Sequence, residues 1–378
     1  MHLVVVSHAC VTDINQQIYA EIEQLGHKVD LIVPSNFVAP GLTQEPISVK
    51  RWPEFKGRII EIPTALNKSI PLHFYRRSMK KFFREYKPDA VYVAEEPYSL
   101  SCYQAIKCAI PYTKAIGFYS AQNINKNYPY LFRKLEEYVY RHSNMAVSIS
   151  QDVTKVLRDK GYENNICEIP LGVDEDHFVI NSQLKLDAKS QCGIPSDAYV
   201  IGFAGRLVEE KGIDLLLKAS SIMMNSIKNI YVLIVGRGPQ IEELKVLTNY
   251  LNIKDRVIFM ESAIHSDMPK WFSCMDVHVL PSKTMPNWRE QFGRVIIEAA
   301  ACGVPTIGSS SGEIPVVLKS LGMTSIFEEG NVDELKNQLL KIKKSDYNPE
   351  KIREKAVEMY GNKGVAKQLI SAFSKVVV

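Results

Sequence analysis

Two glutamates stand eight residues apart in the segment REQFGRVIIEAAACGVP, which begins at Arg289. Gly293 precedes an apolar run of helical character that extends to about Cys302, and Gly303 follows as a helix stop. The backbone N–H groups near Gly293 and Arg294 have no partner within such a helix, and the helix dipole adds positive potential there. The segment therefore predicts an anion-binding site at the start of a helix.

The two carboxylates of this segment predict contacts with hydroxyl groups. Glu290 lies just before the predicted helix, where its oxygens could accept hydrogen bonds from sugar hydroxyls. Glu298 lies inside an otherwise apolar run, and a buried carboxylate needs a polar partner. Two neighbouring hydroxyls, as a ribose presents, would be such a partner. Glutamates at this spacing are common on surfaces, so the apolar context is what favours binding.

Two cations follow a predicted strand end in the segment FAGRLVEEKG. Gly205 would let the backbone approach a ligand closely, and Arg206 and Lys211 follow on the loop. A planar guanidinium and a point-charge ammonium at the mouth of a sheet suit a diphosphate. The competing interpretation, equally favoured on this segment alone, is a solvated loop whose cations pair with Glu209 and Glu210.

A second glycine-rich turn, VGRGP, contains Gly236, Arg237 and Gly238. It would permit close approach to a planar base or a phosphate. Strand-to-helix turns use glycine in any case, so this turn is a weak indicator by itself.

Short β-rich runs alternate with longer helical patterns along the chain, which predicts an α/β protein with parallel sheets covered on both faces. A helix is predicted from Thr12 or Asp13 to Gly26, and another after Tyr360. The predicted strands are 3–7, 28–34, 89–96, 114–120, 144–150, 199–205, 230–236, 256–260, 276–282 and 304–310.

The chain of 378 residues is too long for one core and suits two domains. The boundary is expected where a strand ends at Pro170 and a polar stretch follows. We expect a first domain over 1–172, a second domain over 173–360, and a terminal helix over 361–378 that packs back on the first domain. In open α/β sheets the ligand lies at the carboxyl ends of the strands.

Composition excludes several classes of protein. Hydrophobic residues make up 46% and charged residues 23%, as in ordinary globular chains, and no apolar run approaches the roughly 20 residues of a membrane-spanning helix. The N-terminus reads as a strand without a basic leader, which predicts a cytoplasmic location. Seven dispersed cysteines indicate reduced thiols and no zinc motif. The net charge of +4 does not imply nucleic acid.

Together the segments EQFGRVIIEAAACGVP, GFAGRLVEEKGID, VGRGP, DVHVLPS and IPLGVDEDHF resemble the GT-B fold glycosyltransferases of family 4, which are retaining enzymes with nucleotide-sugar donors. The resemblance spans essentially the whole chain and implies two Rossmann-like doubly wound domains, of which the first binds the acceptor and the second the nucleotide sugar. It implies that Arg206, Lys211 and the amides of Gly293 and Arg294 hold the donor diphosphate. It further implies donor contacts at Gly205, Gly236, Arg237, Phe292, Glu290 (sugar) and Glu298 (ribose).

Two loops depart from the pattern of many members. The first loop, SHACVTDIN, has no Gly-Gly pair, so Thr12 and Asn15 are the candidate donors there. Where many members have a histidine after the strand 114–120, this chain has Gln122 and Asn123. Amides bind sugar hydroxyls but do not take up a proton near neutral pH, so we interpret both as positioning residues. A capped turn explains them equally well.

No metal and no cofactor beyond the donor are expected. The Asp-x-Asp of DED at 174–176 follows Gly-Val and belongs to the linker in this family, so it is not interpreted as a metal site. Cationic side chains and a helix N-terminus typically neutralise the diphosphate in the GT-B architecture. Among donors, a UDP-sugar is favoured over a GDP-sugar.

The stretch RRSMKKFFREYK places Met79, Phe82, Phe83 and Tyr86 on one helical face among basic residues. Such a face could contact an anionic membrane surface or a lipid-linked acceptor. A helix of this width more often buries its aromatics in the core, and that interpretation is favoured.

The sequence thus predicts hexose transfer, with retention, from a nucleotide sugar to an acceptor hydroxyl in polysaccharide, glycolipid or glycoconjugate synthesis. Arg206, Lys211 and Glu290 are the predicted catalytic residues, and the acceptor is a carbohydrate or lipid-linked molecule. The alternatives are a nucleotide-sugar 2-epimerase on the same fold and a non-catalytic nucleotide-sugar-binding scaffold. A dehydrogenase is disfavoured because no Gly-x-Gly-x-x-Gly follows the first strand.

Overall fold

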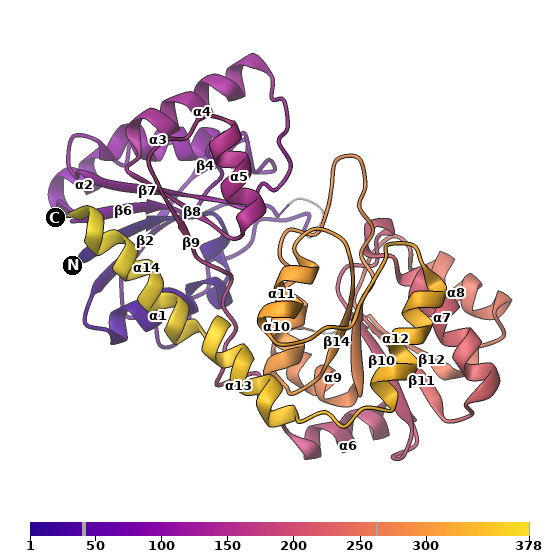
Figure 1. Ribbon diagram of the computed structural model, residues 1–378. Helices are drawn as coiled ribbons and strands as arrows, with labels where there is room; N and C mark the ends of the chain where they lie inside the picture. Colours follow the sequence, from indigo (N-terminus) through magenta and orange to yellow (C-terminus); the bar gives the residue numbers. More distant parts are fainter. Residues whose placement is uncertain (40–42, 262–263, 378) are drawn as a thin grey trace. The chain divides into compact units, whose positions relative to one another are not determined.

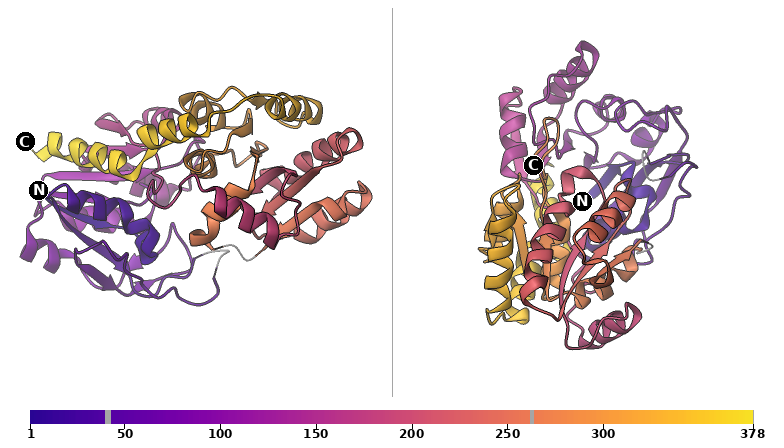
Figure 2. Two further views of the ribbon diagram at one scale, coloured as in Figure 1. Left: turned by 90° about the horizontal axis from the view of Figure 1, so that it is seen from below. Right: turned by 90° about the vertical axis from the view of Figure 1, so that its right-hand side faces the viewer.

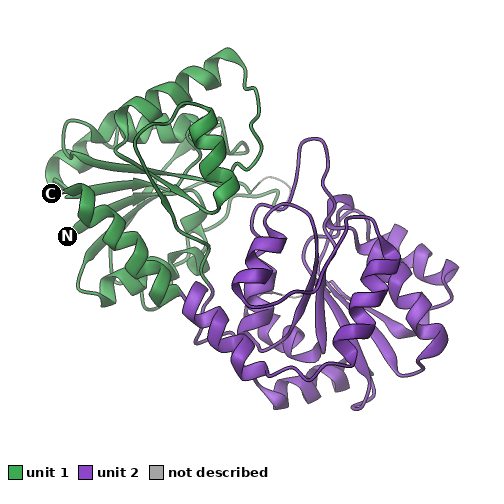
Figure 3. Ribbon diagram, in the orientation of Figure 1, with its two compact units in different colours: residues 1–172, 362–378 green, residues 173–361 purple. Residues whose placement is uncertain are grey.

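The computed structural model describes residues 1–39, 43–261 and 264–377, and the chain divides into two compact units (Figures 1 and 3). Unit 1 comprises Met1–Gly172 with Asn362–Val378, and unit 2 comprises Val173–Gly361. Each unit contains a parallel sheet with helices on both faces, which confirms the predicted α/β class with two Rossmann-like halves.

The main sheet of unit 1 has the strand order β3-β2-β1-β6-β7-β8-β9, with all neighbours parallel. Its strands are continuous apolar runs because both faces are covered. They are β1 (His2–Val6), β2 (Lys28–Pro34), β3 (Ile59–Ile62), β6 (Ala90–Val93), β7 (Ala115–Ser120), β8 (Met145–Ser148) and β9 (Asn165–Glu168). An antiparallel pair, β4 (Thr64–Ala65) and β5 (Phe74–Tyr75), lies outside this sheet.

Helices α1 and α14 pack side by side on one face of this sheet, although they lie at opposite ends of the chain (Figure 2). Val365, Leu369 and Phe373 of α14 belong to the same apolar core as β1 and β2. Helices α3 and α4 pack together on the other face. The helices are α1 (Gln17–Gln24), α2 (Lys80–Tyr86), α3 (Leu100–Ala109), α4 (Tyr130–His142), α5 (Gln151–Asp159) and α14 (Asn362–Val377), with 3-10 turns at Ala9–Val11 and Asp13–Gln16.

The sheet of unit 2 has the order β12-β11-β10-β13-β14-β15, again with parallel neighbours. Its strands are β10 (Tyr199–Ala204), β11 (Ile230–Val235), β12 (Val257–Met260), β13 (Val277–Leu280), β14 (Thr306–Ser309) and β15 (Ile326–Phe327). Its helices are α6 (Ser182–Gln191), α7 (Ile213–Ser226), α8 (Ile241–Tyr250), α9 (Met268–Cys274), α10 (Arg294–Ala301), α11 (Ile314–Ser320), α12 (Val332–Lys343) and α13 (Pro349–Tyr360). Three 3-10 turns lie at Glu209–Lys211, Lys254–Arg256 and His265–Asp267.

Each of the ten predicted strands overlaps an observed one, and the predicted helix after Tyr360 is α14. Strand β9 was expected only as a strand that ends at Pro170, and it ends at Glu168. Strands β3, β4, β5 and β15 were not predicted, and they are at most four residues long, too short for a clear periodic pattern. The helix predicted from Thr12 or Asp13 is wrong at its start. The backbone of Thr12 is extended between two 3-10 turns, and the α-helix begins only at Gln17.

The basic stretch around α2 places two of its four face residues in the core, while Phe82 and Tyr86 stay partly exposed. Met79 and Phe83 are fully buried, and the guanidinium of Arg58 lies 3.6 Å from the ring centroid of Tyr86. The core interpretation therefore accounts for these residues, and contact with an anionic membrane stays a prediction. Among the helices of the described residues, none has the length and apolar character to cross a bilayer.

Candidate functional site

The loops that follow β10 and β13 are joined by an ion pair. Lys211 Nζ lies 2.5 Å from Glu290 Oε2, and Ser282 Oγ donates to the same oxygen at 2.9 Å. Only 15% of the lysine side chain and 10% of the glutamate side chain are exposed. Because β10 and β13 are adjacent parallel strands, their carboxyl ends lie at one edge of the sheet. The structure thus joins two residues that the sequence separates by 79 positions.

Backbone contacts hold the same two loops together. Lys283 N–H donates to the carbonyl of Glu210 at 2.7 Å. Gly212 has φ +63°, and a Cβ there would lie 2.1 Å from the carbonyl oxygen of Pro281. A larger residue at 212 would separate the loops, so this glycine allows the close approach that places Lys211 beside Glu290.

Arg206 has a different environment from Lys211. Its side chain is 62% exposed, and its Nη2 atom lies 3.5 Å from Glu210 Oε1. This contact is the loop-internal pairing that the sequence left open for these cations. An exposed pair at this distance is weak and leaves the guanidinium accessible to an anion. The part of Arg206 in diphosphate binding stays a prediction.

The predicted helix in the opening segment is α10, and it begins at Arg294. Gly293 is its N-cap residue with φ +82°, a conformation that glycine adopts without strain. The side chain of Phe292, predicted as a donor contact, is 4% exposed and packs edge-on against Tyr360. Phe292 therefore fixes the entry to α10. The N–H of Ile296 donates to the carbonyl of Gly293 at 2.8 Å, and anion binding by the amides of Gly293 and Arg294 stays a prediction.

Glu298 is buried, as its apolar neighbours predict, but it already has a charged partner. Arg294 Nε lies 3.2 Å from Glu298 Oε1, one helical turn away, although the pair lacks hydrogen-bond geometry. Burial raises the pKa of Glu298 to about 7, and the charge of Arg294 opposes that shift. The burial of this carboxylate therefore does not by itself require a ribose. Its predicted ribose contact stays a prediction.

The glycines at the ends of β10 and β11 pack against each other. A Cβ on Gly236 would lie 1.8 Å from the carbonyl oxygen of Gly205, and φ at Gly236 is +147°. Close packing of two loops therefore explains these glycines without a ligand. Arg237 is exposed, and its Nε donates to the carbonyl of Glu261.

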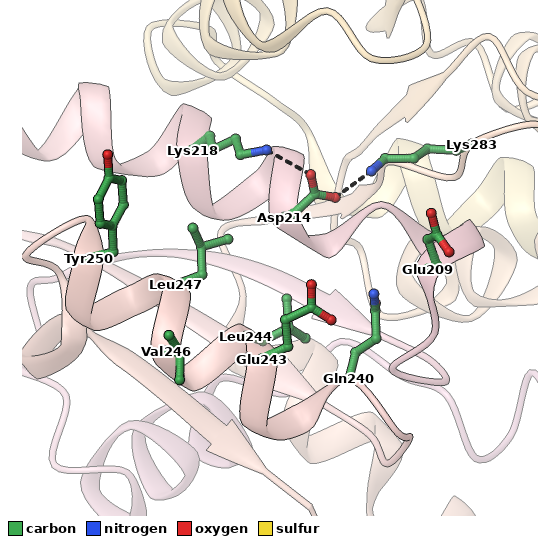
Figure 4. Close-up of a pocket in the computed structure, with 10 residues that line it drawn as sticks. All are labelled: Glu209, Asp214, Lys218, Gln240, Glu243, Leu244, Val246, Leu247, Tyr250 and Lys283. Atoms are coloured by element: carbon green, nitrogen blue, oxygen red, sulfur yellow. Dashed lines mark hydrogen bonds and ion pairs between the residues drawn. The ribbon is translucent and has the colours of Figure 1, made fainter.

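A cavity of about 590 Å³ lies beside these loops, between α7 and α8 (Figure 4). Asp214 bridges two lysines there, at 2.6 Å from Lys283 Nζ and 2.9 Å from Lys218 Nζ. None of the predicted donor residues lines it. Because its cations are already paired with Asp214, an incoming phosphate would have to compete for them. The Lys211–Glu290 cluster is therefore the better candidate site.

The four positioning residues predicted in unit 1 have mostly local contacts. Asn15 Nδ2 donates to the carbonyl of Ala9 at 2.8 Å, and Gln122 Nε2 donates to that of Ile124 at 3.0 Å. Asn123 is buried and Thr12 is partly exposed. The contact of Gln122 is that of a capped turn, which was the competing interpretation. The sugar-binding roles of all four stay predictions.

Sequence reasoning missed a buried polar cluster in unit 1. His8 follows β1, Glu95 follows β6, and His73 precedes β5. Glu95 Oε2 lies 2.6 Å from His8 Nδ1, and Glu95 Oε1 lies 3.8 Å from His73 Nε2. No motif spacing links positions this far apart in sequence. The one available signal was a Glu-Glu pair at the end of a buried strand.

Two family models together match nearly the whole chain. The model "Glycosyltransferase Family 4" matches residues 15–177, and the model "Glycosyl transferases group 1" matches residues 185–359. The chain belongs to glycosyltransferase family 4.

Curated relatives match about half of this family 4 chain. A GDP-mannose-dependent alpha-(1-6)-phosphatidylinositol monomannoside mannosyltransferase of Mycolicibacterium smegmatis is 28% identical over 169 residues. That match covers 44% of this chain and 44% of the relative. A D-inositol 3-phosphate glycosyltransferase of Streptomyces avermitilis is 33% identical over 198 residues, which cover 50% of this chain and 41% of the relative. The chain thus spans less than half the length of either relative.

Solved structures share the fold over the whole chain. The glycosyltransferase from Rickettsia africae has a TM-score of 0.76 at 17% identity and covers 100% of this chain and 98% of its own. HepE of Anabaena in complex with UDP and glucose has a TM-score of 0.70 at 16% identity, with 99% and 100% coverage. At these identities the likeness shows the GT-B fold alone.

Proposed function

We propose that this protein transfers a hexose from a nucleoside-diphosphate sugar to an acceptor hydroxyl, with retention of configuration. The observation that carries the proposal is the ion pair between Lys211 and Glu290, which lies at the carboxyl edge of the unit 2 sheet and just before the N-terminus of α10. A mostly buried ammonium in the loop that leads into a helix N-terminus is an arrangement suited to a diphosphate.

Lys211, the exposed Arg206 and the first-turn amides of α10 neutralise the leaving diphosphate in this scheme. Glu290, oriented by Lys211 and Ser282, contacts the donor sugar. Because fixed positive groups already face the diphosphate, the scheme uses no metal there. Stabilisation of the leaving group is electrostatic, and it needs no side chain that changes its proton occupancy.

Retention follows if the acceptor attacks the face from which the diphosphate leaves. The acceptor oxygen bonds to the anomeric carbon as the bond from that carbon to the phosphate oxygen breaks. The acceptor proton passes to the departing phosphate oxygen. Unit 1 binds the acceptor in this scheme, with Thr12, Asn15, Gln122 and Asn123 as the hydroxyl-binding side chains.

A UDP-sugar is the favoured donor, and a polysaccharide, glycolipid or glycoconjugate precursor is the proposed acceptor. HepE, a structural neighbour, is described with UDP and glucose, whereas a sequence relative is named for GDP-mannose. The names of the relatives include lipid-linked and small-molecule acceptors, so both classes belong in an acceptor screen.

The decisive experiment measures release of nucleoside diphosphate from a panel of UDP-, GDP- and ADP-sugars. We expect the Arg206→Ala variant to lose turnover by about 10²-fold, because one stabilising donor at the leaving group is removed. Lys218→Ala is the matched control, since Lys218 pairs with Asp214 on α7, and it should retain turnover. Full activity of Arg206→Ala would remove this residue from the site. No release from any donor by the native protein would overturn the proposal.

Product analysis distinguishes retention from inversion, and a transferase from an epimerase. The anomeric configuration of the product, read by NMR, distinguishes retention from inversion. Incubation of the donor without acceptor tests the epimerase: a transferase leaves the donor sugar unchanged apart from slow hydrolysis, whereas an epimerase converts it.

A further inference from the structure

Three side chains that could ligate a metal meet in unit 1, far from the donor-binding residues in sequence. His8, His73 and Glu95 each offer one ligand atom, and these atoms all lie within 4.8 Å of one another. The side chains of His73 and Glu95 are fully buried, and that of His8 is 19% exposed. Their backbones come from three segments: the loop after β1, the turn before β5 and the loop after β6.

His73 carries an unsatisfied lone pair. Its Nδ1 lies 2.7 Å from the carbonyl oxygen of Ile70, and because a carbonyl can only accept, Nδ1 holds the ring proton. In the neutral ring Nε2 is then an acceptor, and this buried atom has no hydrogen-bond partner among the described residues. It faces Glu95 Oε1 at 3.8 Å. With the ring neutral, two electron-rich atoms face each other, and a positive charge between them, either a metal ion or a proton on Nε2, would satisfy both.

Glu95 is held for this role by the backbone of His8. The N–H of His8 donates to Glu95 Oε1 at 2.7 Å, while His8 Nδ1 lies 2.6 Å from Oε2. The carboxylate is therefore oriented toward both imidazoles. The bond from His73 Nδ1 to a backbone carbonyl is the outer-shell contact that metal-ligating histidines usually make, because it fixes the tautomer and the ring orientation.

We propose that His8, His73 and Glu95 bind a divalent transition-metal ion, with Zn²⁺ the best fit. Two histidines and a glutamate are a known zinc ligand set that leaves one position for water. Tetrahedral ligands at about 2.0–2.1 Å from zinc lie about 3.3 Å apart. Glu95 Oε2 lies 2.6 Å from His8 Nδ1 and Glu95 Oε1 lies 3.8 Å from His73 Nε2, on either side of that value, and one ligand atom from each residue lies within 4.8 Å of the other two. Small movements of the three side chains would therefore complete the site. The ion replaces the proton shared by His8 Nδ1 and Glu95 Oε2, and that proton goes to solvent.

A bound ion would tie the β4–β5 hairpin to the main sheet of unit 1. His73 lies next to β5, outside the main sheet, whereas His8 and Glu95 follow its adjacent strands β1 and β6. Because the complete site exists only in the folded unit, binding stabilises that unit. The ion does not touch the residues assigned to the diphosphate, so this proposal stands independently of the proposed function.

The test uses the full-length protein freed of metal by a chelator and then dialysed. Zn²⁺ is titrated in competition with a chromophoric chelator, and Co²⁺ is added as a spectroscopic substitute. We expect one equivalent of Zn²⁺, visible d–d absorption with Co²⁺, and a rise in the unfolding temperature of the native protein. Mg²⁺, which prefers oxygen ligands, should produce no shift. Failure of the native protein to bind either ion in a 1:1 ratio overturns the proposal.

Variants locate the ion. His73→Asn keeps a polar group near Ile70 but loses the ligating nitrogen, and His8→Asn changes the more exposed ligand, so at least one should fold. Each should weaken Zn²⁺ binding at least tenfold and abolish the Co²⁺ absorption. His142→Asn is the matched control, because His142 Nδ1 also bonds a backbone carbonyl, that of Tyr138. If His142→Asn loses Zn²⁺ binding to the same extent, or if His73→Asn and His8→Asn both keep it, the ion binds elsewhere and the proposed site is refuted.

Discussion

Two carboxylates, one in each unit, are paired in closely similar ways but with different chemistry. Glu290 in unit 2 lies 2.5 Å from an ammonium, and Glu95 in unit 1 lies 2.6 Å from an imidazole. Both follow a parallel strand, and both are nearly inaccessible to solvent. An ammonium has only donors and no lone pair to offer a metal, whereas an imidazole nitrogen can be a metal ligand.

The difference indicates what each cluster is suited to bind. A permanent cation beside a helix N-terminus attracts an anion such as a diphosphate. Two imidazoles around one carboxylate, one of them with an unsatisfied lone pair, attract a cation. In the two proposals, a carboxylate that follows a parallel strand therefore takes part in binding ligands of opposite charge, according to the basic residues beside it.

Removal of the Lys211 ammonium should have the largest effect on activity. Lys211→Met is expected to lower the rate of nucleoside-diphosphate release by about 10²–10³-fold, because the leaving group loses a preorganised positive charge. Steady-state kinetics with the donor of the panel that is turned over fastest measures this rate. Lys218→Met should retain the native rate, and an equal loss there would mean that general surface charge, and not the Lys211–Glu290 cluster, matters.

The two clusters can be compared directly by replacing each glutamate, Glu290 or Glu95, with glutamine and measuring the stability of the variant. Glu290→Gln leaves a mostly buried ammonium without its counter-charge, and we expect a loss of about 3 kcal/mol in the free energy of unfolding. Glu95→Gln leaves an imidazole that can stay neutral and still hydrogen-bond, so about 1 kcal/mol is expected. Denaturant unfolding of metal-free protein gives both values. Equal losses would contradict the distinction between an ammonium partner and an imidazole partner.

The packing of the unit 2 loops can be tested at two glycines with positive φ. Gly236→Ala brings a methyl group against the carbonyl of Gly205, and we expect a loss on the order of 3 kcal/mol. Gly330→Ala is the matched control: its φ is +80°, but no atom lies within 4 Å of the new Cβ, so only about 1 kcal/mol of backbone strain is expected. If both variants lose the same stability, the close contact of the two loops contributes nothing.

The buried acid of α10 should produce the most pH-dependent effect. The folded-state pKa of Glu298 is raised to about 7 from 4.5, mainly by burial. Between those values the folded state holds a proton that the unfolded state has released, so native stability falls as pH rises through this window. Glu298→Gln cannot lose a proton. We expect its stability relative to the native protein to rise by about 2 kcal/mol from pH 5 to pH 8.

Denaturant midpoints at each pH measure this difference. A difference between Glu298→Gln and the native protein that stays constant over the range would show that Arg294 keeps the carboxylate charged in the folded state.

Sequence patterns anticipated unit 2 better than unit 1. The segments around Lys211 and Gly293 predicted a strand end, a helix start and an anion site, because each feature depends on residues within about ten positions. The helix expected from Thr12 or Asp13 exists, but it begins only at Gln17, since two 3-10 turns with local contacts precede α1. The sequence predicted the burial of Glu298 from its apolar neighbours. It did not predict the pairing of Glu298 with Arg294, which depends on side-chain conformation.

By itself the sequence determined the α/β class, the division into two Rossmann-like units and the strand ends that carry charge, because periodicity and turn residues act over short distances. Tertiary structure alone decided which charges meet. It placed Glu290 on Lys211 across 79 residues, left Arg206 in solvent and joined His8, His73 and Glu95 from three separate segments. The physical reason is that parallel sheets bring together strand ends that are remote in sequence, and burial then requires their charges to find partners.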